Sequence, residues 1–156
     1  GKLLVESSKN TNTEVTYKVT KVLHSNDFEI VQSEGEMLVE KVKIILIQLL
    51  TQLPLHLKTN TSEHLSSTLN RDYKILSRLF SKNENTTIEK YFIKLKIEKV
   101  KELIQLKQYS FSDVAYMLDY SSINHLSRQF KEIVGMSMSD YKNTEKWKRN
   151  FYDEII

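Results

Sequence analysis

The sequence predicts a mainly α-helical fold, a tandem helix-turn-helix bundle joined by a long linker helix, with a small N-terminal strand–helix–strand segment. The main observation is a repeat offset by fifty residues. LSRLF at residues 76–80 is followed by Tyr91, and LSRQF at residues 126–130 is followed by Tyr141. Repetition at a fixed distance identifies a duplicated supersecondary unit. A composition with three glycines and one proline in 156 residues also favours helices.

Composition and charge limit the class of protein. A hydrophobic content of 40% and a charged content of 28% are ordinary for a folded soluble domain. Residues 1–54 carry six Lys or Arg and seven Asp or Glu (net −1), whereas residues 55–156 carry seventeen and thirteen (net +4). The basic excess lies in the half with the repeat, which phosphate binding would favour. A lysine-rich, solvated helical surface would give the same balance.

The absence of two features, cysteine and a long apolar segment, excludes further kinds of site and protein. The chain has no cysteine, which excludes disulfides, thiol chemistry and a cysteine-ligated zinc cluster. No apolar segment is long enough to span a bilayer, because the most apolar stretch, residues 37–53, is interrupted by Glu40, Lys41 and Lys43. We therefore expect a protein without a membrane association.

Residues 1–35 are expected to form a partial α+β accessory segment. Residues 2–6 and 28–31 have the composition of strands, and Val15, Val19 and Val22 recur between them at helical spacing. This order is similar to the second half of a ferredoxin-like, heavy-metal-associated domain. The metal-binding cysteine motif of that family is absent, so the resemblance implies no metal site here.

Residues 37–53 predict an amphipathic helix that stops before Pro54, because proline cannot continue a helix. Its dense apolar positions are Met37, Leu38, Val42, Ile45, Leu46, Leu49, Leu50 and Leu53. We interpret it as the first core helix of a second domain, residues 36–156. Ile44 and Ile47 make the apolar surface wider than one stripe, which leaves a dimerisation helix open as the alternative.

The first helix-turn-helix unit is expected between residues 60 and 82. The sequence NTSE beginning at Asn60 is a capping-box candidate for a supporting helix, and residues 70–72 make the turn. In the next helix Leu76 and Phe80 face inward. The outward face then carries Lys74, Arg78 and Ser81, with Tyr73 and Ser77 beside them.

A linker helix is expected over about residues 87–107, with Thr86 and Glu89 as capping-box candidates. Its broad apolar face comprises Ile88, Tyr91, Phe92, Leu95, Val100, Leu103 and Ile104. Four of its lysines are expected to be solvated, namely Lys90, Lys94, Lys101 and Lys107.

The second unit is expected between residues 110 and 135. Ser110 and Asp113 resemble a capping box, and residues 119–122 break the short supporting helix and cap the next one. That next helix carries Leu126, Phe130 and Ile133 on one face. Asn124, Arg128 and Lys131 fall on the opposite face, with His125 at its margin.

A helix that is apolar behind and carries Asn, Arg and Lys in front suits a DNA major groove. The alternative is that any amphipathic helix has a solvated polar face with some arginine in it. The arginine recurs at the same position in both copies, as Arg78 and Arg128, which favours the groove-binding interpretation.

These motifs resemble the DNA-binding domain of AraC/XylS-family transcription regulators over residues 58–142. The chain supplies both LSRxF motifs, TIEKY at residues 87–91, VA at residues 114–115 and GMSMSDY at residues 135–141. The resemblance implies that the linker helix holds two recognition helices about one turn of DNA apart, so that they enter successive major grooves.

The chain departs from the family pattern at four positions. The family's Gly-Phe in the second turn is Asp119–Tyr120, the proline after Ser137 is Met138, and the common alanine of the first supporting helix is Ser66. The linker-helix arginine is Lys96, which keeps the charge but loses the planar guanidinium. None of these changes removes the helix-turn-helix pattern.

We therefore expect sequence-specific binding of double-stranded DNA and regulation of transcription. Arginine can bridge guanine O6 and N7, and asparagine can bridge adenine N6 and N7. The expected base-reading residues are Lys74, Ser77, Arg78, Asn124, His125 and Arg128. The expected phosphate contacts are Lys82, Ser121, Ser122 and Lys131.

The expected partner is double-stranded DNA, and a homodimer through residues 37–53 or the N-terminal segment remains open. We expect a cytoplasmic location, at the nucleoid when bound to DNA, and no cofactor or metal. Any small-molecule effector is unknown.

An enzyme is not expected. The four histidines are scattered, and the chain has no glycine-rich phosphate loop, HExxH or GxSxG motif. The alternative function is a protein–protein interaction module, with the helix-turn-helix pair as a scaffold and the 37–53 helix as the partner interface.

Overall fold

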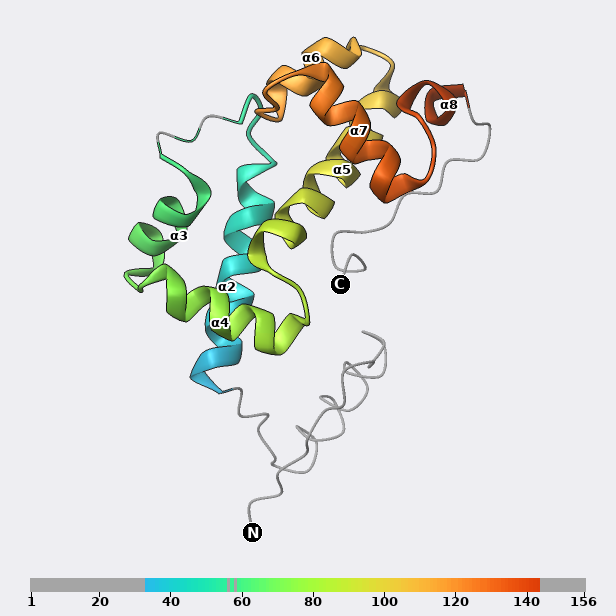
Figure 1. Cartoon of the computed structure of the whole chain (residues 1–156). Coiled ribbons are helices and arrows are strands. Elements are labelled where there is room, and N and C mark those ends of the chain that lie inside the picture. Colours follow the sequence, from blue (N-terminus) through green and yellow to red (C-terminus); the bar gives the residue numbers. More distant parts are fainter. Residues whose placement is uncertain (1–32, 56, 58, 144–156) are drawn as a thin grey trace, which may run out of the picture. The chain divides into compact units, whose positions relative to one another are not determined.

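The computed structural model describes residues 33–55, 57 and 59–143 (Figure 1). The chain divides into two units, Gly1–Ser33 and Glu34–Ile156, and almost all described residues belong to the second. The predicted strand–helix–strand segment of residues 1–32 lies outside the described residues. Within the described part every regular element is a helix, which confirms the mainly helical fold. The helices are α2 (Glu34–Leu49), α3 (Thr61–Leu69), α4 (Tyr73–Glu84), α5 (Ile88–Leu106), α6 (Phe111–Met117), α7 (Ile123–Val134) and α8 (Met138–Asn143).

Helix α5 is the element that connects the two helix-turn-helix units. Helices α3 and α4 form the first unit, and α6 and α7 form the second. Helix α5 packs against α4 and, towards its other end, against α6, α7 and α8 (Figure 1). Its buried positions extend from Ile88 to Ile104, so both units share one continuous apolar core with it. The expected linker arrangement is therefore present.

Helix α2 is a core helix of the first unit, packed on α3 and α4. It buries Val39, Val42 and Leu46, while Met37 and Ile44 on other faces remain about half exposed. The prediction that the helix continues to residue 53 is wrong, because it ends at Leu49. The chain there closes into a turn in which the Thr51 hydroxyl donates to the Gln48 carbonyl at 2.7 Å. A side-chain hydroxyl of this kind competes with helical hydrogen bonding.

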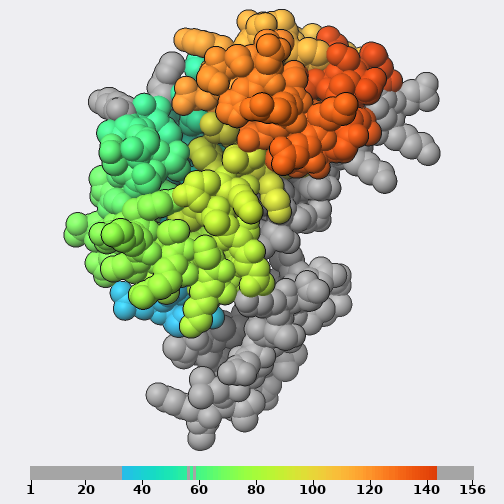
Figure 2. Space-filling view, in the orientation of Figure 1, coloured from blue at the N-terminus to red at the C-terminus, as the bar shows by residue number. Residues whose placement is uncertain are grey.

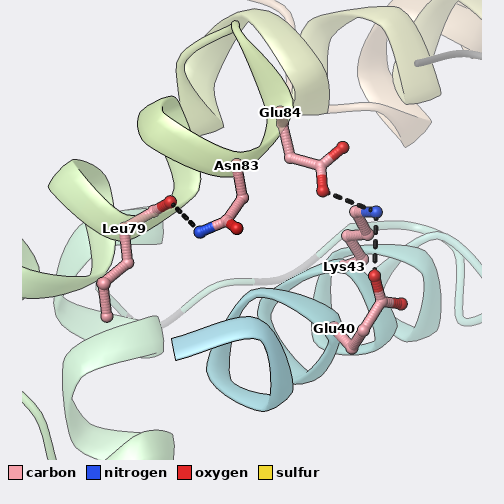
Figure 3. A network of polar contacts seen from close by, with 5 residues as sticks. All are labelled: Glu40, Lys43, Leu79, Asn83 and Glu84. Atoms are coloured by element: carbon pink, nitrogen blue, oxygen red, sulfur yellow. Dashed lines mark hydrogen bonds and ion pairs between the residues drawn. The ribbon is translucent and has the colours of Figure 1, made fainter. Parts of the chain in front are cut away.

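A polar contact also fixes α2 to α4 (Figure 3). The Lys43 ammonium lies between two carboxylates, 3.0 Å from Glu40 of its own helix and 2.9 Å from Glu84 at the end of α4. Lys43 and Glu84 are mostly buried, with side chains 13% and 11% exposed, so solvent screens this pair less than a surface pair. The contact therefore holds the C-terminal end of α4 against α2.

Short polar residues form the caps and turns between the helices of the first unit. Asn60 caps α3 by accepting from the Glu63 amide at 2.8 Å, and Asp72 caps α4 by accepting from the Lys74 amide at 2.7 Å. Asn70 has a left-handed backbone, with φ 49°, which asparagine tolerates better than most residues. The expected turn at residues 70–72 is confirmed.

The second unit follows the same plan. Ser110 and Asp113 form the predicted capping box, with both reciprocal hydrogen bonds present. Asp119 takes a left-handed backbone, φ 56°, at the place where the family pattern has glycine. Ser122 then caps α7 by accepting from the His125 amide at 3.1 Å. The short supporting helix α6 buries Val114 and Ala115 as predicted.

Two expectations for the linker helix are wrong. Its N-cap is Thr87, which accepts from the Lys90 amide at 3.2 Å, rather than Thr86. Lys101 is buried, 8% exposed, because α5 is covered nearly all round at this level, and its ammonium pairs with Glu98 at 2.5 Å. Within the described residues, no helix combines the length and the apolar character needed to cross a bilayer.

Candidate nucleic-acid interface

Helix α4 presents a row of cations on the face opposite its core contacts. Leu76 and Phe80 are buried against the rest of the first unit. Because side chains four residues apart share a helix face, Lys74, Arg78 and Lys82 lie in line along the exposed side. Ser77 is half-buried beside this row. The structure thus brings together the four residues of α4 that the sequence predicts as DNA contacts.

The N-terminal end of α4 is fastened to the linker helix. The Tyr73 hydroxyl donates to the Glu89 carboxylate in the first turn of α5. Burial, together with Glu89, raises the pKa of Tyr73, so the phenol remains a donor. Burial would raise the pKa of Glu89, but hydrogen bonds from Tyr73, its own backbone and Thr87 outweigh this and lower it. The contact therefore pairs a neutral phenol with a carboxylate.

Helix α7 is the counterpart in the second unit. Leu126 and Phe130 are buried, and Asn124, Arg128 and Lys131 are exposed, as predicted. The expectation that Ile133 belongs to the buried face is wrong, since it is 41% exposed. Its neighbour Val134, at the end of the helix, packs against the core instead.

The start of α7 holds His125 in a defined position. The hydroxyl of Ser121 lies 3.1 Å from His125 Nδ1, and the Tyr120 ring meets the imidazole edge-on with centroids 5.4 Å apart. Ser122 uses its oxygen as the helix cap, which leaves its hydroxyl hydrogen available for donation. The imidazole is thus half-buried rather than free to rotate, and Nε2 is the ring nitrogen left for another partner.

An open pocket of about 270 Å³ adjoins the cationic face of α7. Its walls include Arg128 and Lys131 together with the hydroxyl-bearing Ser127, Ser137 and Ser139. These three serines are absent from the predicted site residues. The repeat could have indicated two of them, because Ser127 matches Ser77 and Ser137 matches Thr87. Ser139 matches Glu89, so the repeat gives no signal for it.

Both arginines of the repeat are accessible. Within the described ranges neither Arg78 nor Arg128 takes part in an ion pair, whereas Arg71 in the first turn pairs with Glu34 at 3.3 Å. An unpaired, exposed guanidinium can still make two parallel hydrogen bonds with a planar acceptor pair. Arg78 and Arg128 are therefore better candidates for ligand binding than Arg71.

The ten predicted site residues do not form one cluster. Four lie on α4, and six lie on α7 or in the two residues before it, while α5 packs against both helices. Both helices reach the molecular face seen in Figure 2, α4 in green and α7 in orange. Among the residues that the structure describes, no group of His, Asp or Glu is arranged to hold a metal ion. The predicted site residues thus lie on two separated helix faces.

Comparison with known proteins agrees with the helix-turn-helix fold. A family model described as "Helix-turn-helix domain" matches residues 65–144, more than half of the chain. No curated protein matches the sequence.

Three solved structures have a similar fold. One is the C-terminal domain of AraT, a response regulator from Geobacillus stearothermophilus. It has a TM-score of 0.61 and 19% identity over 78% of this chain and 100% of that one. A transcriptional regulator (AraC-type DNA-binding domain-containing proteins) from Chromobacterium violaceum gives 0.58 and 16%, over 71% and 95% of the two chains. A DNA-binding transcriptional dual regulator from Escherichia coli K-12 gives 0.56 and 16%, over 68% and 95%.

Proposed function

The chain belongs to the family of AraC-type helix-turn-helix domains, and from this premise we propose that it regulates transcription by reading a specific sequence in double-stranded DNA. The observation that supports this most is the pair Arg78 and Arg128. Each is exposed at the same position of a recognition helix whose other side is buried through a leucine and a phenylalanine. A duplicated reader of this kind suits a duplex with two half-elements.

In the proposed complex α4 and α7 enter successive major grooves. Arg78 and Arg128 each donate two hydrogen bonds to guanine O6 and N7, and Asn124 bridges N6 and N7 of an adenine. Lys74 and Ser77 on α4, and His125 on α7, complete the base-reading set. His125 contributes through Nε2, since Nδ1 already faces Ser121.

Phosphate contacts hold the two helices in register. Lys82 and Lys131 supply charge, and the hydroxyls of Ser121 and Ser122 at the start of α7 supply neutral donors. The serines beside Lys131 in the open pocket add donors next to that cation. Such contacts carry no sequence information, but they fix the orientation in which the base-reading residues meet the duplex. A regulator of this kind acts at the nucleoid, in the cytoplasm.

The alternative of a protein–protein interaction module has less support. Its partner interface was expected on residues 37–53, but Val39, Val42 and Leu46 of α2 are already buried within the first unit. The main apolar side of α2 is therefore occupied, and a partner would meet only the half-exposed Met37 and Ile44.

Hydroxyl-radical footprinting on a selected duplex tests the proposed docking. We expect two protected stretches on one face of the DNA, with centres about one helical turn apart. One continuous stretch that is independent of sequence would indicate only electrostatic binding, and a single short stretch would mean that only one helix enters a groove.

A further inference from the structure

Lys96 lies in an unusual position for a lysine of the linker helix. Its ammonium is 5.2 Å from the centre of the Phe92 ring, one turn earlier on α5, and also 5.2 Å from the centre of the Tyr120 ring. Tyr120 is in the turn between α6 and α7, so the lysine connects the linker helix to the second unit. Burial lowers the pKa of Lys96, and the nearby Asp119 carboxylate partly offsets this.

Tyr120 continues the connection into the recognition helix. Its hydroxyl donates to Gln129 Oε1 at 2.7 Å, and its ring meets the His125 ring with centroids 5.4 Å apart. Its backbone amide is bonded to the Ala115 carbonyl of α6 at 2.9 Å. The Tyr120 side chain therefore contacts Lys96 of α5 and two residues of α7 that lie one turn apart, His125 and Gln129.

The connection is absent from the first copy. The residue fifty positions before Tyr120 is Asn70, which has no ring. The residue fifty positions before Gln129 is Leu79, whose side chain has no hydrogen-bond acceptor. The first unit is fastened to α5 through Tyr73 and Glu89 instead. The contacts of Lys96 and Tyr120 are thus not a by-product of the duplicated fold.

We propose that Lys96 and Tyr120 form a clamp that sets the orientation of α7 on the linker helix, and thereby the distance between DNA half-elements that the protein accepts. The DNA part of this proposal rests on the proposed function, whereas the orientation of α7 does not. Neither residue needs to touch DNA, so both are positioning residues.

The orientation can be measured without DNA. Because the chain has no cysteine, Lys41→Cys on α2 and Glu132→Cys on α7 would carry the only two spin labels, both at exposed positions. Electron–electron distance measurements on the full chain should give one narrow distribution. Lys96→Ala should broaden or shift it, and Lys96→Arg should restore it, because a guanidinium also stacks on aromatic rings. Lys94→Ala, which removes an exposed lysine of the same helix, is the matched control.

Tyr120→Phe keeps the two aromatic rings beside Lys96, those of residues 92 and 120, and removes only the hydrogen bond to Gln129. It therefore provides the test if Lys96→Ala does not fold. A broadened distribution in this variant supports the clamp. A distribution as narrow as that of the unchanged protein, in every variant that folds, would overturn it.

Affinity for duplexes with altered spacing then tests the functional consequence. The quantity to compare is the affinity for the duplex with the preferred spacing divided by that for a duplex whose spacing is one base pair longer. Lys96→Ala should lower this ratio by between about twofold and about thirtyfold, which is the range for one cation–π contact. An unchanged ratio would overturn the spacing role alone. If the unchanged protein prefers no two-part sequence at all, both the spacing role and the proposed function fail, while the label distances still report on the clamp.

Discussion

The ring of Phe80 meets the ring of Tyr91 edge-on, with centroids 5.3 Å apart and an angle of 62° between the planes. Fifty residues later Phe130 and Tyr141 repeat the contact at 5.5 Å and 70°. In each unit the phenylalanine comes from the recognition helix and the tyrosine from the helix that follows it. The repeat in the sequence therefore corresponds to a repeated core contact that supports each recognition helix from behind.

Loss of this contact should destabilise the domain strongly. Phe130 is fully buried, so Phe130→Ala removes a large side chain from a close-packed core and should cost about 3–5 kcal/mol of unfolding free energy. Urea denaturation followed by circular dichroism measures it. Ile133→Ala on the exposed side of the same helix should change stability by less than about 0.5 kcal/mol. Equal effects of the two substitutions would contradict the assigned packing.

Lys107 ends α5 with a left-handed backbone, φ 56°. Glycine adopts this conformation without steric cost, so Lys107→Gly should stabilise the protein by up to about 1 kcal/mol. The matched substitution Lys94→Gly, at an exposed position in the interior of the same helix, should destabilise it by about 1 kcal/mol. Thermal or urea unfolding of the two variants should show opposite signs; a loss of stability in both would exclude a left-handed cap at residue 107.

The contact between Tyr73 and Glu89 should make stability depend on pH. The folded-state pKa of Glu89 is below its ordinary value of 4.5, so its contribution is complete above that value and is lost as the pH falls through the lower folded-state value. The difference in unfolding free energy between the unchanged protein and Glu89→Gln should therefore shrink as the pH is lowered below 4.5. Tyr73→Phe should reduce the same pH dependence. A difference that stays constant across this range would show that Glu89 has no such role.

Lys131 is proposed to contact phosphate only. Lys131→Ala should lower affinity for all duplexes by a similar factor and reduce the slope of log affinity against log salt by about one unit. Anisotropy titrations of a labelled duplex between low and moderate salt give this slope. Lys94→Ala, on the linker helix, serves as the control and should leave the slope unchanged. If Lys131→Ala leaves it unchanged too, Lys131 does not neutralise a phosphate.

Much of the fold could be predicted because it depends on local signals. The helix caps Asn60, Ser110 and Ser122 and the turn at Asp119 are short polar residues whose side chains bond to nearby backbone or tolerate a left-handed backbone. The inward positions of both recognition helices follow from helical periodicity.

The errors at Thr86 and at the end of α2 are local and shift an element boundary by a few residues. Those at Lys101 and Ile133 concern tertiary surroundings, which periodicity does not contain. Lys101 looks like a solvated lysine in sequence, but α5 is enclosed at that level and the ammonium pairs with Glu98. The roles of Lys96 and Tyr120 depend on a contact between residues 24 positions apart. The base-reading and phosphate-binding roles stay predictions, because they depend on a duplex that makes its contacts outside the fold.

The most direct test of the central claim is selection of bound sequences from a random duplex library, carried out with the unchanged protein and with Arg78→Ala and Arg128→Ala. We expect a motif of two half-elements about one helical turn apart, in which each substitution relaxes a different half and costs about 1–3 kcal/mol. Absence of any enriched motif at moderate salt would contradict sequence-specific recognition. A motif that both substitutions weaken uniformly would show that the two arginines contact phosphates rather than bases.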